Sequence, residues 1–352
     1  DRTSPDKIAA TCTNLPEEAR NSLNALPTNE SVLAAAMRKV PVVVGQVGLF
    51  TDLPKGKETT KKRSPFRVFK GTHPRPFLFQ YSSLLANVAL LEEHASGHGF
   101  FSVWEEFDGI IRRVPLIARV GKKDIRPALT VEMLRAAYGT NTLVTKANDA
   151  GIESIAMQIK GARGQFFDIP LDGNGRIWVH FSKPAKHSVP PGESRLYISA
   201  ADVLADRVPA NLLKGKLVLV GTSAAGLQDI RNTPVSGRLP GVEVHANILE
   251  SVFAAEGEFQ KEVQKQFKEL VAGGMPQQQA AQQVRAIDKR DYFLRYPAWA
   301  NSAEMFLILL SGILLIVLIP RLGPVLTLVV FTFAGSGLLA LSVYLYINDK
   351  LL

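Results

Sequence analysis

Two long runs of apolar residues stand near the C-terminal end of the chain. The first extends from Trp299 to Pro320 and the second from Pro324 to Ile347, with Arg321 as the only charge between Met305 and Asn348. An α-helix rises about 1.5 Å per residue, so about 20 residues cross a hydrocarbon core of about 30 Å. Each run has that length, which is more than a typical buried core helix needs. The pattern predicts an antiparallel transmembrane hairpin within residues 297–352.

The link between the two runs indicates which side of the membrane the rest of the chain occupies. Arg321 is its only charged residue, and positive charge in short loops weakly favours the cytoplasm. Trp299, Tyr344 and Tyr346 lie near the ends of the runs, where interfacial aromatic residues are common. We therefore expect a multi-pass protein of the inner (cytoplasmic) membrane in contact with membrane lipid. Its large N-terminal part then lies in the periplasm or outside the cell.

Residues 41–254 alternate between strand-like and helix-like patterns. Short apolar runs of the kind found in buried strands occupy Pro41 to Gly45, Val114 to Val120 and Leu217 to Val220. Helical spacing or capping residues mark Pro127 to Tyr138, the segment that follows Ser199, and Val242 to Phe253. Strands that alternate with helices predict an α/β domain with a mostly parallel sheet. Residues 166–171 and 176–181 flank Asp172-Gly173-Asn174-Gly175, which suits a tight hairpin turn.

Residues 256–290 follow a different pattern. Five large apolar side chains fall on one helical face, namely Phe259, Val263, Phe267, Leu270 and Val271. Gly273-Gly274 stops this helix and Pro276 can start a second one, so we predict an inserted amphipathic helical hairpin. The apolar stripe suggests an assembly surface in a homo-oligomer. The alternative is that the stripe packs within the chain.

Composition and charge narrow the class of protein. Of the 352 residues, 46% are hydrophobic and 21% are charged, which excludes a disordered chain. A single cysteine, Cys12, excludes internal disulfides and Cys-rich zinc modules. The net charge of +9 comes in large part from a run between Lys55 and Arg63. Such a run is more often a solvated loop than a DNA-binding face, so we expect no nucleic-acid partner.

Several catalytic and metal-binding patterns are incomplete. His94 and His98 lack the intervening Glu of a His-Glu-x-x-His site, and the loop at Asp172 carries Arg176 where a calcium ligand belongs. The glycine-rich segment at 221–226 lacks the lysine of a phosphate-binding P-loop, and a Gly-x-Ser-x-Gly elbow is missing. These residues contain no catalytic set, and we expect neither a cofactor nor a metal. Whether the full-length protein is an enzyme stays open.

One long stretch resembles a known family. Its markers are Asp202-Val203-Leu204, Val220-Gly221-Thr222, Thr233-Pro234, Pro240 to Asn247 and, upstream, Asp108 to Leu116. Tyr296-Pro297-Ala298-Trp299 matches the approach to the membrane. Over most of its length the chain resembles the type 2 CHASE domain, a cyclase/histidine-kinase associated sensory extracellular module. By this likeness residues 1–255 form the sensor domain and 256–296 the hairpin and membrane approach. Asp1 to Pro5 match a point just after the family's first buried strand, so the chain is expected to begin inside the domain.

The resemblance implies an extracytoplasmic sensor in a membrane-bound bacterial signalling protein. The output of such proteins is most often a class III adenylate or guanylate cyclase, and histidine or Ser/Thr kinases are alternatives. A structural membrane-assembly subunit is a further alternative. The family supplies no agreed ligand, so the expected partner is an unidentified extracytoplasmic ligand or protein.

The predicted topology suggests where a ligand would bind. Ligands of parallel α/β sheets lie beyond the carboxyl ends of strands, and the segment after Leu217 to Val220 contains four candidates for a ligand site or a switch, namely Thr222, Ser223, Asp229 and Arg231. Alternatively, Asp229 only accepts backbone N–H bonds and Thr233 only caps a turn. Glu243, His245 and Asn247 place further polar groups in an apolar helix. A buried, hydrogen-bonded His245 is favoured over a ligand contact or a pH sensor.

Overall fold

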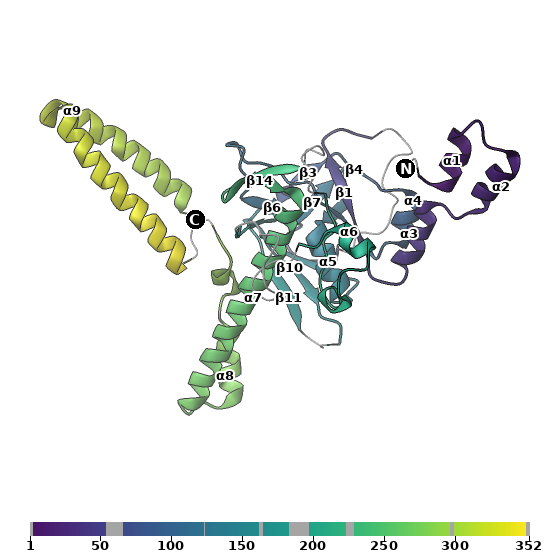
Figure 1. Ribbon diagram of the computed structural model, residues 1–352. Helices are drawn as coiled ribbons and strands as arrows, with labels where there is room; N and C mark the ends of the chain where they lie inside the picture. Colours follow the sequence, from purple (N-terminus) through teal and green to yellow (C-terminus); the bar gives the residue numbers. More distant parts are fainter. Residues whose placement is uncertain are drawn as a thin grey trace. The chain divides into compact units, whose positions relative to one another are not determined.

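The computed structural model describes residues 3–53, 66–122, 124–161, 165–182, 197–222, 229–295 and 299–349 (Figure 1). The chain forms two compact units. The first comprises residues 1–177 and 181–249, and the second comprises residues 178–180 and 250–352. The first unit combines helices and strands, whereas the described elements that lie wholly in the second unit are helical.

Three short helices come first, α1 (Pro5–Thr11), α2 (Glu17–Ala25) and α3 (Asn29–Met37). Their boundaries follow local chemistry, because proline occupies the first turn of α1 and the Thr28 side chain caps α3 by accepting a bond from the Ser31 N–H.

β1 (Val43–Leu49) is the central strand of a three-stranded sheet. It runs parallel to β5 (Gly97–Phe100) and antiparallel to β4 (Ser83–Leu85). The strand predicted from Pro41 to Gly45 is therefore confirmed in part, because the observed strand begins at Val43 and continues to Leu49. α5 (Leu129–Ala137) packs against β5, where a Cβ on Gly99 would lie 2.5 Å from the Leu129 backbone. Glycine at this position lets the helix backbone approach the sheet.

The other strands form a four-stranded sheet in the order β11–β10–β9–β2 and three smaller sheets, β3–β7–β8, β12–β6 and β13–β14. Their bounds are β2 (Phe66–Gly71), β3 (Gln80–Tyr81), β6 (Arg113–Pro115), β7 (Ile117–Val120), β8 (Asp124–Pro127), β9 (Leu143–Asn148), β10 (Gly151–Gln158), β11 (Phe166–Pro170), β12 (Arg176–Trp178), β13 (Ile230–Thr233) and β14 (Ser236–Pro240). The short connecting elements are η1 (Arg75–Phe77), α4 (Ala89–His94), α6 (Ala200–Leu204) and η2 (Ala210–Leu212).

The sheets are mixed, so the prediction of a mostly parallel sheet is wrong. Parallel pairs are β1–β5, β2–β9 and β3–β7, whereas β1–β4, β7–β8, β9–β10, β10–β11 and β13–β14 are antiparallel. A continuous apolar run indicates that a strand is buried on both faces, but it does not give the strand's direction. Direction depends on the connection, and the short turn at Asp149 and Ala150 forces β9 and β10 to run antiparallel.

Three further strand predictions need correction. The run from Val114 to Val120 is divided at Leu116 into β6 and β7. The turn at 172–175 is confirmed, with Gly175 at a φ of 78°, but β11 pairs with β10 and β12 pairs with β6 instead of with each other. The run from Leu217 to Val220 forms no strand, and Val220 is 92% exposed.

The predicted helix boundaries are closer to the structure. α5 begins at Leu129 instead of Pro127, because Pro127 is the last residue of β8, and it ends before Gly139, whose φ is 65°. Ser199 caps α6, since its hydroxyl oxygen accepts a bond from the Ala201 N–H. Local capping signals therefore located these helices.

The core of the first unit is apolar and lies between the sheets and α5. Its largest fully buried side chains are Tyr81, Phe100, Leu84, Ile111, Leu116, Ile117, Leu134, Leu143, Ile155, Met157, Ile169 and Leu239.

α7 (Gly241–Ala272) is one helix of 32 residues. The predicted helix from Val242 to Phe253 and the first helix of the predicted hairpin are thus a single element. Gly273 and Gly274 end α7, and α8 (Gln277–Val284) begins after Pro276, as the sequence predicted. The short helix η4 (Lys289–Tyr292) follows.

The apolar stripe of α7 is partly covered within the second unit. Its five residues are half-buried, and α8 contributes the buried Ala280 and Val284. The Phe259 ring lies 5.6 Å from the Tyr292 ring, and the Lys289 ammonium lies 5.6 Å from the centre of the Phe259 ring. These contacts favour the alternative in which the stripe packs within the chain, while a homo-oligomer stays a prediction.

α9 (Ala300–Asp349) is the one described helix long and apolar enough to cross a membrane. Its candidate span covers Ser302–Leu345 with a mean hydropathy of 2.6. The backbone leaves the helical region at Gly323, with φ 74° and ψ 165°, and the two halves lie side by side (Figure 1). The sequence had predicted two spans, whereas the structure has one candidate span with an internal break.

Candidate functional site

The β13–β14 hairpin and the first turn of α7 bring together several of the predicted site residues. The Gly241 N–H donates to the Asp229 carbonyl over 2.9 Å, and a Cβ on Gly241 would lie 2.3 Å from Asp229 Oδ1. Arg231 Nη2 lies 3.2 Å from the same carboxylate oxygen. The Asp229 carboxylate therefore sits against the positive end of the α7 dipole, where a negative charge is stabilised.

His245 lies one turn further along α7 and is only 5% exposed. Its Nε2 is 3.1 Å from the Phe101 carbonyl oxygen, so Nε2 carries the proton and donates this bond. Nδ1 has no hydrogen-bond partner among the described residues. Burial lowers the pKa of His245 to about 4, although the bond to Phe101 and the charge of Asp229 act in the opposite direction. The imidazole is therefore neutral at neutral pH.

Asn247 and Thr233 make contacts that hold the backbone. The Asn247 amide donates to the Glu243 carbonyl, and its oxygen accepts bonds from the N–H and the hydroxyl of Ser182. The Thr233 hydroxyl closes the turn of the β13–β14 hairpin by bonding both the N–H and the carbonyl of Ser236. Glu243 is buried in the first turn of α7.

The remaining candidates do not join this group. Thr222 is exposed, and Ser223 lies outside the described residues. The predicted reason for a ligand site here also fails, because Leu217 to Val220 is not a strand with a carboxyl end. The structure thus brings together Asp229, Arg231 and His245 for a different reason, which is the packing of α7 against its neighbours.

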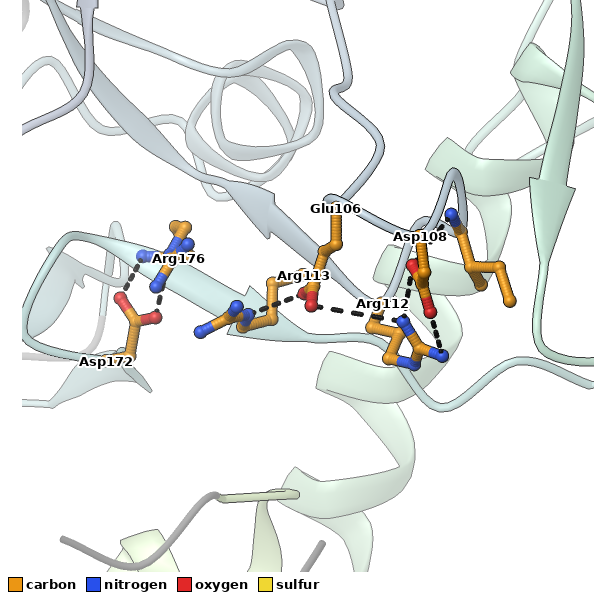
Figure 2. Close-up of polar contacts among 7 residues, drawn as sticks. Glu106, Asp108, Arg112, Arg113, Asp172 and Arg176 are labelled. Carbon is orange, nitrogen blue, oxygen red and sulfur yellow. Dashed lines mark hydrogen bonds and ion pairs between the residues drawn. The ribbon is translucent and has the colours of Figure 1, made fainter. Parts of the chain in front are cut away.

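The segment from Phe101 to Arg113 is part of the site but was missed as such by sequence reasoning. Its charged residues form a row of ion pairs (Figure 2). Arg113 Nε lies 2.7 Å from Glu106 Oε1, while Arg112 lies 2.8 Å from Asp108 and 3.9 Å from Glu106. The Arg112 side chain holds the pKa of Asp108 below its ordinary value, against the opposing effect of burial. The acidic Asp108, followed four and five residues later by Arg112 and Arg113, was the sequence signal that could have indicated these ion pairs.

A second ion pair borders this row, because Arg176 on β12 lies 2.8 Å from Asp172 (Figure 2). The Asp172 carboxylate also accepts bonds from the backbone N–H groups of Asn174 and Arg176. It therefore fixes the turn that was weighed as a calcium loop.

The Phe101–Arg113 segment contacts both parts of the α7 site. At one end the Phe101 carbonyl accepts the bond from His245, and at the other the Ile111 N–H donates to the Asn232 carbonyl of β13 over 2.9 Å. In its middle, Trp104 Nε1 donates to the Tyr81 hydroxyl, and burial raises the pKa of Tyr81 to about 12. A displacement of this segment would therefore alter the surroundings of His245 and β13 together.

Other buried ionisable groups of the first unit lie outside this site. Glu92 accepts bonds from Gln46 and Asn87 and pairs with His98, and these contacts lower its pKa despite burial. His94, the other half of the rejected zinc pair, lies within 2.8 Å of the Leu90 carbonyl through Nδ1. In the described part of the chain, no three His, Cys, Asp or Glu side chains are grouped to hold a metal ion.

Among the described residues, the geometry of the candidate site is that of a helix held at its start. Comparison with protein families decides what kind of protein carries it, because the model of the CHASE2 domain matches residues 4–276. The chain belongs to the CHASE2 domain family. CHASE2 domains are extracellular sensory domains of signalling proteins. No curated protein and no solved structure matches the chain.

The CHASE2 match covers the whole candidate site, since it includes the Phe101–Arg113 segment, the β13–β14 hairpin and the start of α7. The match also covers the whole of α7 and ends at Pro276. The contacts of Asp229, Arg231 and His245 are thus features of the sensory domain itself.

Proposed function

We propose that this chain is the extracytoplasmic sensory and transmembrane part of a bacterial signalling protein, and that it regulates a class III nucleotide cyclase. Membership of the CHASE2 family supports the sensory role, and the apolar helix α9 supports the membrane attachment. A cyclase is preferred over a histidine or Ser/Thr kinase because of the resemblance described above. The stimulus is an extracytoplasmic ligand or protein.

The proposed topology is a helical hairpin that crosses the inner membrane twice. At about 1.5 Å per residue, a straight helix from Ser302 to Leu345 would be about twice as long as a hydrocarbon core of about 30 Å. The break at Gly323 divides it into halves that each match one crossing. Arg321 beside the break favours a cytoplasmic turn, which leaves the sensory unit in the periplasm or outside the cell.

One observation carries the proposed mechanism, namely that α7 is continuous from Gly241 to Ala272. Its first turns contact Asp229 and, through His245, the Phe101 carbonyl. A helix transmits a displacement of its first turns along its axis, because each turn is bonded to the next. We propose that the stimulus displaces the Phe101–Arg113 segment and that α7 carries this displacement toward the membrane.

The signalling role is tested with the intact protein in membranes. Cyclic AMP and cyclic GMP formation from added ATP and GTP are measured alongside protein phosphorylation from labelled ATP. A nucleotide cyclase output requires cyclic nucleotide to accumulate above membranes that lack the protein. Phosphorylation without cyclic nucleotide would replace the cyclase with a kinase.

The coupling through α7 is tested with two variants of one residue. His245→Leu removes the donor to the Phe101 carbonyl, whereas His245→Gln keeps an N–H donor of similar reach. We expect His245→Leu to change the basal output severalfold and His245→Gln to change it little. Equal output from both folded variants and the parent protein would show that this contact does not carry the signal.

A further inference from the structure

Two routes lead from α7 to the apolar helix α9 within the second unit. The chain itself runs along α7 to Ala272, turns at two glycines, returns through α8 and reaches η4, from which residues 293–299 lead to α9. A shorter route exists because η4 contacts α7 directly at Glu256 and Phe259, well before α7 ends. The helical hairpin is therefore closed at its base by side-chain contacts.

An ion pair forms the first of these contacts. Glu256 of α7 pairs with Lys289 of η4, and the two side chains are mostly buried, with exposed fractions of 20% and 15%. The other carboxylate oxygen of Glu256 accepts a bond of 2.8 Å from the Gln260 amide, which fixes the carboxylate on α7. A pair that is largely buried is screened less by salt and water than an exposed pair. It therefore restricts the movement of η4 relative to α7.

Aromatic contacts hold the same two elements together. The Tyr292 ring lies edge-on to Phe259 with 5.6 Å between the ring centres, and the Lys289 ammonium lies 5.6 Å from the centre of the Phe259 ring. Both arrangements are favourable for the aromatic ring. Asp288 caps η4, so the short helix that carries Lys289 and Tyr292 is itself fixed. We call Glu256, Phe259, Lys289 and Tyr292 the α7–η4 clamp.

The longer route is less suited to transmit a displacement. It passes through Gly273 and Gly274, and Gly274 has a φ of 91°. Glycine restricts the backbone least of all residues, so a turn of two glycines deforms easily. The shorter route crosses buried and paired side chains. A displacement of the first turns of α7 therefore reaches η4 through the clamp before it reaches the turn of the hairpin.

We propose that the α7–η4 clamp is the contact through which α7 passes its displacement to α9, and that residues 261–287 are a side branch of this route. The inference rests on the proposed function and deepens it, because it names the contact by which the sensory domain acts on the membrane helix. Coupling should therefore depend on the charge of Lys289. It should not depend on charges further along α7, such as the exposed Lys268.

Thiol labelling at the start of α9 tests the clamp without using any signalling output. In the full chain in membranes, with Cys12→Ser, the substitution Ser302→Cys places one thiol at an exposed position near the start of α9. The rate of maleimide labelling is measured with and without His245→Leu, which removes the contact of α7 with the Phe101 carbonyl. With the clamp intact, we expect His245→Leu to change this rate by about fivefold or more, the low end of typical coupling between sites. In a Lys289→Glu background, the rate should stay the same.

Three variants make the result specific. Glu256→Lys combined with Lys289→Glu restores an ion pair but not the cation beside the Phe259 ring, so the response to His245→Leu should return in part. Lys268→Glu makes the same charge change on the side branch and should leave the full response. Lys289→Gln keeps a side chain of similar length and replaces Lys289→Glu if that variant does not fold.

The clamp is overturned by any of three results. The response to His245→Leu could be absent when the clamp is intact, it could persist when Lys289 is replaced, or Lys268→Glu could abolish it equally.

Cyclic nucleotide formation and phosphorylation are recorded on the same membranes, which separates this inference from the proposed function. A clamp-dependent response at Ser302 without either product would support the clamp and refute the signalling output. Cyclic nucleotide formation together with a response that does not depend on Lys289 would refute the clamp alone.

Discussion

His245 should make the first unit less stable in mild acid. The ring is buried and neutral in the folded chain, where burial lowers its pKa from 6.5 to about 4. As the pH falls, the imidazole is protonated in the unfolded chain before it is protonated in the folded chain. The contribution of His245 to the free energy of unfolding is therefore fully present above about pH 6.5 and is lost as the pH falls toward 4. Between pH 7.5 and pH 5 the difference corresponds to about 2 kcal/mol of unfolding free energy.

Other groups titrate in the same range and must be subtracted. Burial raises the pKa of Glu132, so its contribution to stability increases as the pH falls, whereas the lowered pKa of Glu92 has the opposite effect. Asp229 and Arg231 face the His245 ring and act on its pKa in opposite directions. A His245→Gln variant keeps these groups and removes only the imidazole.

The measurement is urea unfolding of the detergent-solubilised chain at both pH values, followed by tryptophan fluorescence. Trp104 reports on the first unit, since its indole N–H is bonded to the Tyr81 hydroxyl, and Trp178→Phe with Trp299→Phe removes the other two signals. The parent should lose about 2 kcal/mol more than His245→Gln between pH 7.5 and pH 5. Equal losses would refute a buried, neutral His245.

Three further predictions follow from named contacts. Gly97→Ala should destabilise the first unit by about 3 kcal/mol or more, because the added Cβ would lie 2.3 Å from Glu132 Oε2, which belongs to a buried ion pair. The control is Gly257→Ala in α7, whose Cβ would meet no atom within 4 Å, so it should be neutral or stabilising by up to about 1 kcal/mol. Urea unfolding of both variants and the parent protein measures the difference. Asp229→Ala should lower the melting temperature by removing the charge at the start of α7 and the partner of Arg231, while Asp229→Asn should keep part of the stability; unchanged melting of both would contradict a structural role. Cys12 is exposed and is the sole thiol, so a membrane-impermeant maleimide should label it in intact spheroplasts, and labelling only after lysis would reverse the proposed topology.

Features that depend on neighbouring residues were predictable from the sequence. The Ser199 cap, the stop at Gly274 and the start after Pro276 each depend on backbone geometry within a few residues, and all three are present. The length and apolar composition that make α9 a candidate membrane span were visible in the same way. Local chemistry is visible in a single sequence because the interacting groups are adjacent.

Features that depend on distant residues were not predictable. The bond between His245 and the Phe101 carbonyl joins positions 144 residues apart, and no periodicity reports such a pair. The prediction of strand direction failed for a similar reason, because the direction of a strand is set by the connection to its neighbour and not by the residues of the strand itself. Val220 was expected to be buried because its neighbours are apolar, yet burial also needs a partner to cover it, and the described chain does not supply one.

The unbroken course of α7 restricts how this protein can change in length. A helix advances about 100° per residue, so the number of residues between two faces of α7 decides how far apart they lie around the helix axis. Removing one residue between them would turn the later face by about 100° relative to the earlier one, whereas removing seven would misalign them by only about 20°. Insertions and deletions that keep both faces should therefore come in lengths close to a whole number of turns, such as seven, eleven or eighteen residues, in this part of the chain.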